Sequence, residues 1–336
     1  PDRVTRGADV YITSNVPLNK GVSSSASVEV AVMKTAAHAY GIDMEGVELA
    51  EACQWSENFI AESACGIMDQ IAVVLGDEDC ILPLLCQPCQ ARPLVKLPGD
   101  LRCWAVDSGV SHAVTGLEYE SARAAAFMGY KLICDWEGLE PRPDESGAVP
   151  RWVDPIWNGY LANIPPSVFR SRYEERLPDV LTGAEYLETA KIHVDPFTHA
   201  RPEAAYRIRA NTSYAVEENA RVCLFSELAR GGTGFAEMGE LMFQSHCAYN
   251  ECGLGNEATD LLVELVRQAG AENGLYGAKV TGGGAGGTVA VLGHKDASHI
   301  FRRVVANFGE RRQFTPYVFE GSSAGADRLG VLEFHL

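Results

Sequence analysis

The stretch PLNKGVSSSASVEV, residues 17–30, places a glycine and three consecutive serines directly before a run rich in Ala and Val. The run contains no Gly or Pro up to residue 40, which predicts a helix over residues 24–40. Gly21 permits a tight turn, and the residues after it present closely spaced backbone N–H groups at the beginning of that helix. These groups and the helix dipole suit an anion such as phosphate. The alternative is a serine that caps the helix and binds nothing.

Two other groups in this loop have possible roles. One serine hydroxyl suits Mg²⁺ as a ligand, because this ion prefers oxygen and keeps phosphates as further ligands. Lys20 is expected either to touch a phosphate or to be a solvated loop residue. The pattern G-x-x-x-x-G-K-[ST] is absent, so the loop is not the common nucleotide-binding P-loop.

Length and charge limit the possible partners. The chain has 336 residues, which favours two domains, and its net charge is -17. Nucleic acids and anionic membranes attract clustered Lys and Arg, so the charge disfavours both as partners. No apolar run reaches the roughly 18 residues that suggest a membrane span. We also find no signal peptide, and we expect a cytoplasmic protein. The chain begins at Pro1 without Met, and we expect that a native N-terminal segment is missing.

Ten cysteines are spread along the chain. Several lie in apolar patterns, such as Cys53 and Cys103, and are expected to be buried thiols in a reducing compartment. Cys86 and Cys89 form a C-x-x-C pair, but no second pair and no H-x-x-x-H accompanies it, so the sequence gives little support for a zinc site.

Periodicity and turn residues predict the order of the other elements. Six of the sixteen prolines fall in residues 137–166, which predicts an irregular insertion. A domain boundary is expected near residue 100, which gives domains 1–100 and 101–336. We expect strand and turn over residues 1–22, helices over 44–62, from about 66, over 118–136, from about 203, and over 235–251 and 258–270, buried strands over 79–86 and 101–110, and an alternation of strands and helix after residue 276.

Two acidic residues lie where carboxylates are costly. Glu57 follows Leu49 and Cys53 at a spacing of four, on the apolar face of the second helix, so it needs a partner such as Mg²⁺ or an edge position open to water. Asp69 lies in the apolar run CGIMDQIAVVLG, residues 65–76, and is either a structural hydrogen-bonding group or a functional one. Near a phosphate site, it would orient or deprotonate a sugar hydroxyl for attack on a γ-phosphate.

A second glycine cluster, TGGGAGG, covers residues 281–287 between two strand-like stretches. Five glycines in seven residues indicate a close approach of the backbone to another group. A flexible linker is the alternative, which core-like strands on both sides disfavour.

These stretches together resemble the GHMP kinases. PLNKGVSSSAS resembles their second motif, the phosphate loop, and KVTGGGAGGTVAVL resembles their third. CQWSENFIAESACGIMDQIAVVLG and VDSGVSHAVTGLEYESARAAAFMG are similar to segments of the galactokinase branch. LMFQSHCAYNECGLGNEATDLLVELV and VFEGSSAGADRLG are most similar to L-arabinokinases within that branch.

The resemblance implies an α+β fold of two domains. The first is the remainder of an ATP-binding domain like domain 2 of ribosomal protein S5, and the second is a ferredoxin-like GHMP C-terminal domain. It also implies roles. Asp69 matches the catalytic aspartate that engages the anomeric hydroxyl, and Ser25 and Glu57 match the Mg²⁺ ligands. The remaining roles are phosphate binding by Gly21, Ser23, Ser24, Ser25, Ala26 and Ser27, sugar contacts by Gly66, Asp69 and Tyr119, and backing of the site by the third-motif glycines Gly283 and Gly284.

The first motif of the family, a GEHTDY-like stretch, has no match here. In relatives it lies upstream of the phosphate loop and supplies an arginine, sugar contacts and part of the adenine pocket. We expect that it was removed, that it is a separate chain, or that it belongs to a part of the protein outside this sequence, and that this chain alone is weakly active or inactive.

The resemblance implies an ATP-dependent sugar 1-kinase with Mg-ATP and a monosaccharide, most simply L-arabinose, as ligands. Galactose, galacturonate and fucose are alternative acceptors. A sugar sensor that binds both ligands without transfer is the alternative from another class. The intact pair of Asp69 and Glu57 favours catalysis.

Overall fold

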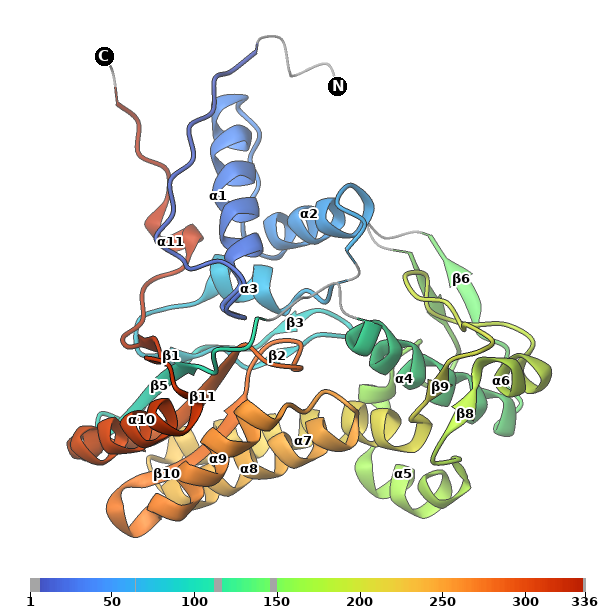
Figure 1. The fold of residues 1–336 in the computed structure, drawn as a ribbon. Coiled ribbons are helices and arrows are strands. Elements are labelled where there is room, and N and C mark those ends of the chain that lie inside the picture. The colour runs from blue at the N-terminus through green and yellow to red at the C-terminus, as the bar shows by residue number, and fades with distance from the viewer. Residues whose placement is uncertain (1–6, 64, 112–116, 146–149, 335–336) are drawn as a thin grey trace.

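The computed structural model describes residues 7–63, 65–111, 117–145 and 150–334 (Figure 1). The helices are α1 (Ser24–Ala39), α2 (Gly46–Phe59), α3 (Met68–Leu75), α4 (Leu117–Trp136), α5 (Pro166–Arg172), α6 (Gly183–Ala190), α7 (Ile208–Gly231), α8 (Phe235–Glu251), α9 (Glu257–Ala269), α10 (Ser298–Arg312) and α11 (Ala326–Leu329). The strands are β1 (Cys80–Ile81), β2 (Leu84–Leu85), β3 (Gln90–Ala91), β4 (Val95–Lys96), β5 (Leu101–Asp107), β6 (Arg142–Asp144), β7 (Arg151–Val153), β8 (Leu181–Thr182), β9 (Ala205–Tyr206), β10 (Leu275–Val280), β11 (Thr288–His294) and β12 (Val318–Phe319). In this described part of the chain, no helix has both the length and the apolar character to cross a bilayer.

The largest sheet has four antiparallel strands in the order β10-β11-β5-β12. In chain order these strands are β5, β10, β11 and β12. The first of them, β5, therefore lies in the sheet between the third, β11, and the fourth, β12. This is the ferredoxin-like arrangement expected from the resemblance. The segment that joins β5 to β10 contains α4 to α9, in place of a single crossover helix (Figure 1).

Successive side chains of β11 point to opposite faces of this sheet, and both faces are buried. Val289 and Val291 join a core cluster with the apolar side chains of α9 and α10. Ala290 and Leu292 point into a second cluster, which contains Met238 of α8 and apolar residues of α7. The sheet is therefore covered on both faces, and its ends and connecting loops are the parts left open for a site.

Glycines allow α8 to lie directly on β10. A Cβ atom on Gly239 of α8 would lie 1.9 Å from the backbone oxygen of Tyr276, and one on Gly277 would lie 2.4 Å from the Cα of Gly239. No side chain fits at either position, so this close helix–strand contact depends on both glycines. It fixes β10, and with it the loop that follows β10.

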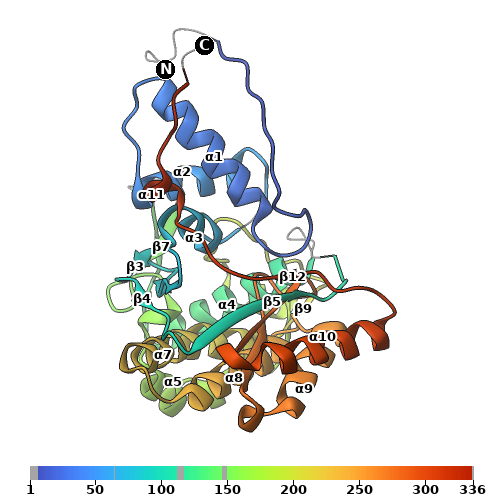
Figure 2. The same ribbon diagram turned by 90° about the vertical axis from the view of Figure 1, so that its left-hand side faces the viewer.

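The N-terminal helices form a separate cluster. Val30 of α1, Leu49 and Cys53 of α2, and Ile71 and Val74 of α3 are buried against one another. Near its end the chain returns to these helices through α11 (Figures 1 and 2). There the Asp327 carboxylate pairs with Lys34 at 2.8 Å and accepts a hydrogen bond of 2.6 Å from the backbone N–H of Gly46 at the beginning of α2.

The third part of the fold surrounds α4 and α7. Residues of α4, α5, α6 and α7 share one core with Tyr173, Tyr206 and other large side chains. The proline-rich insertion at 137–166 is more regular than the sequence predicts. It contains the hairpin of β6 and β7, in which Pro143 opposes Trp152, and a short 3₁₀ turn at Leu161–Asn163. The domain boundary near residue 100 stays a prediction.

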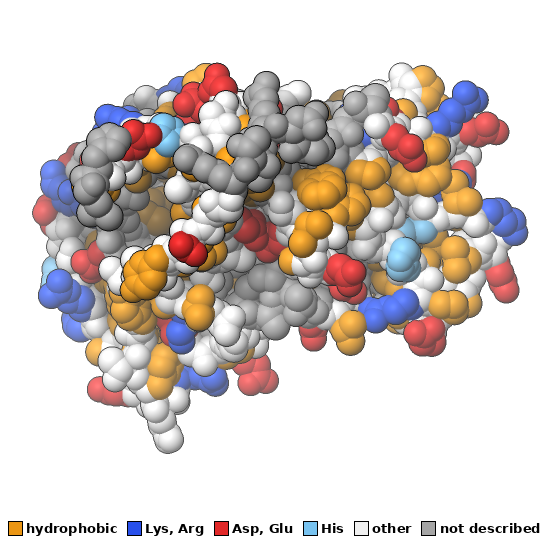
Figure 3. Space-filling model, turned by 90° about the horizontal axis from the view of Figure 1, so that it is seen from above, with side chains coloured by type: hydrophobic (Ala, Val, Ile, Leu, Met, Phe, Trp, Pro, Cys, Tyr) orange, Lys and Arg blue, Asp and Glu red, His pale blue; other side chains and the backbone are white. Residues whose placement is uncertain are grey.

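Three other predictions are corrected. The strand expected within residues 1–22 is wrong for the described residues 7–22, where Val10, Tyr11 and Ile12 are exposed and have no neighbouring strand to pair with. Seen from above, the molecule shows apolar side chains at its surface among acidic and basic ones (Figure 3). The strand predicted over 79–86 is two short, half-buried strands, because Pro83 has no N–H to continue a ladder. Cys53 is buried as expected, but Cys103 is exposed.

Candidate active site

Residues 17–27, called the phosphate loop here after the motif that they resemble, leave the beginning of α1 free of side-chain caps. Gly21 and Ser23 have positive φ angles, 68° and 58°, which turn the chain into α1. Within the described residues, the Ser23 side chain accepts no hydrogen bond from this helix, while the Ser27 backbone N–H and hydroxyl both donate to the Ser23 carbonyl oxygen. Ser25 is exposed and Ala26 is buried. This geometry favours the anion-site interpretation over a serine cap.

The second glycine cluster lies against this loop. A Cβ atom on Gly282 would lie 3.9 Å from the carbonyl oxygen of Gly21. Tyr249 holds the cluster from α8 by donating a 2.7 Å hydrogen bond to the Gly282 carbonyl oxygen. A Cβ atom on Gly284 would lie 2.6 Å from the carbonyl oxygen of Leu254, so no larger residue fits there. The structure therefore brings the second and third motifs together, although Gly21 and Gly282 are 261 residues apart in the chain, as the resemblance implies.

Lys20 joins the two loops to the sheet. Its ammonium group lies 2.6 Å from the buried carboxylate of Asp107 at the end of β5. Its carbonyl oxygen accepts a 2.6 Å hydrogen bond from the hydroxyl of Thr288, the residue opposite Asp107 on β11. Two adjacent strand ends thus hold one residue of the phosphate loop. Of the two sequence interpretations of Lys20, solvated or touching a phosphate, neither includes this ion pair.

We expect Lys20→Met to lower the free energy of unfolding by about 1–2 kcal/mol, because it leaves the Asp107 carboxylate buried without its cation. Urea denaturation measures the change, and amide exchange of residues 19–24 should speed up. Lys295→Met is the matched control, since Lys295 and Asp100 also lie 2.6 Å apart but with side chains 43% and 58% exposed. Water screens that exposed pair, so the control should lose clearly less stability than Lys20→Met. Equal losses in both variants would contradict the prediction.

The acidic residues gather where α1, α2 and α3 meet. Glu57 is buried on α2 and accepts a 2.6 Å hydrogen bond from the side-chain amide of Gln70. The same amide lies 3.2 Å from the carboxylate of Glu29 on α1, four residues after Ser25. Burial, and then the charge of Glu57, raises the pKa of Glu29 to about 7. The side-chain oxygen of Gln70 is buried and has no hydrogen-bond partner among the described residues.

The oxygen atoms of these side chains suit Mg²⁺ as ligands. Crowded carboxylates and an unpartnered amide oxygen are oxygen ligands that a cation would stabilise. Within the described residues, no three His, Cys, Asp or Glu side chains are grouped as a complete ligand set. Mg²⁺ usually takes one or two protein oxygens and completes its shell with phosphates and water. Glu57 and Ser25 as its ligands remain a proposal.

The candidate sugar contacts lie together at the start of α3 and α4. Asp69 lies in the first turn of α3 and is half-buried. A Cβ atom on Gly66 would lie 3.8 Å from the phenolic oxygen of Tyr119. Burial raises the pKa of Tyr119, Arg123 opposes the rise, and the charge of Asp69 adds to it, so Tyr119 and Asp69 lie within electrostatic reach. Gly66, Asp69 and Tyr119 therefore lie near one another, and Asp69 is on the same helix as Gln70.

Sequence reasoning missed Gln70 and Glu29. The signal was present for both, because each is a polar residue inside an apolar run, in MDQIAVV and SVEVAV. The distance between them could not be read from the sequence, since it depends on how α1 and α3 cross.

Two family models match the chain. The GHMP kinases N terminal domain matches residues 2–77, and the GHMP kinases C terminal domain matches residues 224–311. L-arabinokinase of Arabidopsis thaliana is 36% identical over 346 residues, which covers 96% of this chain. The chain belongs to the GHMP kinases. A galactokinase of Chloroflexus aurantiacus is 31% identical over 294 residues and covers 87% of this GHMP kinase.

A solved structure shows the same fold. The galactokinase of Lactococcus lactis complexed with galactose superposes on 93% of this chain with a TM-score of 0.69 at 19% sequence identity. The predicted two-domain GHMP kinase fold is confirmed. The chain spans 33% of the length of the Arabidopsis L-arabinokinase and 62% of the Chloroflexus galactokinase.

Proposed function

We propose that this GHMP kinase phosphorylates the anomeric hydroxyl of a monosaccharide with Mg-ATP, and that L-arabinose is the acceptor. The observation that carries the proposal is the set of groups near Asp69. Burial raises the pKa of both Tyr119 and Glu29, and the charge of Asp69 adds to both rises. Asp69 therefore lies within electrostatic reach of a candidate sugar contact and of the acidic residues, and the next residue, Gln70, donates a hydrogen bond to Glu57. A sugar beside Tyr119 and a nucleotide on the phosphate loop would meet at the Asp69 carboxylate. The 36% identity to an L-arabinokinase supports the choice of acceptor.

The mechanism follows from charge and position. The N–H groups of residues 21–27 would hold the phosphates at the positive end of α1, and the third-motif loop would close the site behind them. Asp69 would orient the hydroxyl and accept its proton during transfer. Glu57 and the Ser25 hydroxyl would hold Mg²⁺, which neutralises charge on the transferred phosphoryl group. Such catalysis is mostly positioning and electrostatic stabilisation.

The choice between L-arabinose and D-galactose as acceptor depends on one chemical group of the sugar. L-arabinose and D-galactose share the stereochemistry of their ring hydroxyls, and galactose carries an additional hydroxymethyl group. A pocket rejects an added group of that size only modestly, unless a wall clashes with it. We therefore propose L-arabinose as the preferred rather than the exclusive acceptor.

The test is coupled ADP release with Mg-ATP against L-arabinose, D-galactose, D-galacturonate and L-fucose. It is run on this chain and on the chain extended by an upstream segment with the family's first motif. Fastest turnover on L-arabinose supports the proposal. Preference for another sugar would keep the mechanism and overturn the acceptor. Binding of sugar and ATP with no ADP release in either form would overturn the kinase in favour of a sensor.

We expect Glu57→Gln to raise the Mg²⁺ concentration needed for half-maximal activity by about tenfold or more, with the affinity for sugar little changed. The glutamine keeps the shape of the side chain and loses the charge that a cation requires. Glu48→Gln, an exposed position on the same helix, is the control and should leave the Mg²⁺ dependence unchanged. An unaltered Mg²⁺ dependence in Glu57→Gln would remove it from the ligand set.

A further inference from the structure

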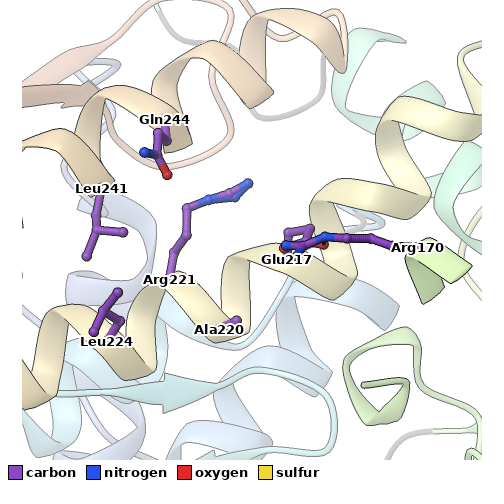
Figure 4. Close-up of a pocket in the computed structure, with 7 residues that line it drawn as sticks. All are labelled: Arg170, Glu217, Ala220, Arg221, Leu224, Leu241 and Gln244. Carbon is purple, nitrogen blue, oxygen red and sulfur yellow. Dashed lines mark hydrogen bonds and ion pairs between the residues drawn. The ribbon is translucent and has the colours of Figure 1, made fainter. Parts of the chain in front are cut away.

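A pocket lies between α5, α7 and α8, on helices that carry none of the candidate active-site residues (Figure 4). It has a volume of about 290 Å³. Arg170 of α5 lies at one end and Gln244 of α8 at the other, and Arg221 extends from α7 into the space between them (Figure 4). Ala220, Leu224 and Leu241 give the pocket an apolar side.

The charges around this pocket do not balance. Arg170 and Glu217 neutralise each other, because Nε and Nη2 of the arginine donate to both carboxylate oxygens. Arg221 has a poorer partner. It lies 3.3 Å from the carboxylate of Glu218, and neither its Nη1 nor the Oε2 of Glu218 makes a hydrogen bond within the described residues, although both atoms are buried.

Glu218 is shared with other donors. Its second oxygen accepts a 2.5 Å hydrogen bond from the Ser245 hydroxyl and lies 3.4 Å from the ammonium group of Lys279. One carboxylate thus faces two cations, Arg221 and Lys279. The seven lining residues carry two guanidinium groups and one carboxylate, and Glu240 beside them accepts a 3.3 Å hydrogen bond from the lining residue Gln244. A concave, partly apolar place with more guanidinium than carboxylate groups in its lining suits an anion.

We propose that this pocket binds a small organic anion. Its carboxylate or phosphate would pair with Arg221, the guanidinium that lacks a well-formed partner. Its apolar body would lie on Leu224 and Leu241, and Leu224 is 43% exposed without a ligand. A guanidinium fork suits both kinds of oxyanion, so the charge and the apolar surface define the ligand class. The site is independent of the proposed kinase reaction.

The test uses phenyl phosphate and benzoate as probes and benzyl alcohol as the neutral analogue of both. Hydrogen exchange followed by mass spectrometry reports binding locally, in peptides covering residues 214–228 and 238–248, so occupation of the phosphate loop does not interfere. We expect at least one anionic probe to protect these peptides and benzyl alcohol to leave them unchanged. Protection by phenyl phosphate alone would assign a phosphate ligand, and protection by benzoate alone a carboxylate.

Two variants and a control complete the experiment. Arg221→Met removes the cation and should weaken binding of the anionic probe by about tenfold or more. Leu224→Asp places a negative charge at the exposed edge of the pocket and leaves the ion pairs intact. It should weaken binding of the anionic probe by a similar factor. Arg230→Met is the control, because Arg230 forms the same i,i+3 pair with Glu227 on α7, but on the exposed surface. Wild-type binding in both pocket variants, equal protection by benzyl alcohol, or no protection by any probe would overturn the proposal.

Discussion

Replacing Asp69 by asparagine is expected to lower phosphoryl transfer by about 10²- to 10⁴-fold, while ATP binding stays nearly intact. The amide keeps the size of the side chain and its place in the first turn of α3, but it cannot accept the proton of the sugar hydroxyl. The nucleotide would contact the loop at residues 21–27, which this change does not touch. Transfer is measured as ADP release under saturating sugar, in the more active of the two forms described above, and ATP affinity is measured by calorimetry.

Asp43→Asn is the matched control for this experiment. Asp43 is exposed before α2, so the same chemical change there should leave the rate unchanged. A thermal unfolding curve of each variant separates loss of chemistry from loss of fold. Transfer at the wild-type rate in Asp69→Asn would exclude Asp69 as the base and leave it a structural hydrogen-bonding residue.

The parts of the fold that the sequence predicts are the ones with local causes. The run after Gly21 predicts helix 24–40, and α1 occupies residues Ser24–Ala39 with Val30 and Ala37 buried at a helical spacing. The glycines at 281–287 predict a close backbone approach, and the loop at Gly282 lies against Gly21. In both cases a few neighbouring residues determine the conformation.

The parts that escaped prediction depend on distant pairing. Lys20 and Asp107 are 87 residues apart, and their ion pair exists only because β11 pairs with β5 in the register that places Thr288 opposite Asp107. Gln70 contacts Glu29 only because α1 and α3 pack together through Val30 and Ile71. No local pattern encodes such distances, although a polar residue in an apolar run marks a position that needs a partner.

The same limit applies to Arg123, which the sequence did not single out. Arg123 follows Tyr119 by one helical turn on α4, and its Nε and Nη2 donate to both carboxylate oxygens of Asp195, at 2.8 and 3.0 Å. The Thr198 hydroxyl donates a third hydrogen bond to Asp195, at 2.6 Å. The guanidinium also lies 5.0 Å from the ring centre of Phe197, which packs edge-on against Phe59 at the end of α2. This ion pair therefore fixes the segment around Asp195 beside the candidate sugar contacts.

We expect Arg123→Met to lower the free energy of unfolding by about 3–5 kcal/mol at neutral pH, since it leaves the fully buried Asp195 carboxylate without its cation. Arg170→Met is the matched control, because Arg170 makes the same two-pronged contact with Glu217 at 60% exposure and should lose no more than about 1 kcal/mol. The double variant Arg123→Met/Asp195→Asn removes the buried charge and should recover part of the loss. Equal destabilisation by Arg123→Met and Arg170→Met would contradict this account.

The pH dependence of the unfolding free energy tests whether the unpaired charge of Asp195 causes the loss of stability in Arg123→Met. Burial alone would raise the pKa of Asp195, but Arg123 and the hydrogen bonds to the carboxylate outweigh it and hold that pKa below its ordinary value. A lowered pKa stabilises the fold at pH values above the unfolded pKa of about 3.9, and this contribution is lost as the pH falls through the folded value. Without Arg123 the pKa of Asp195 should rise, so the carboxyl group protonates earlier on acidification and its burial costs less. The difference in unfolding free energy between Arg123→Met and wild type should therefore shrink between neutral pH and about pH 4, whereas a loss caused by packing alone would stay constant with pH.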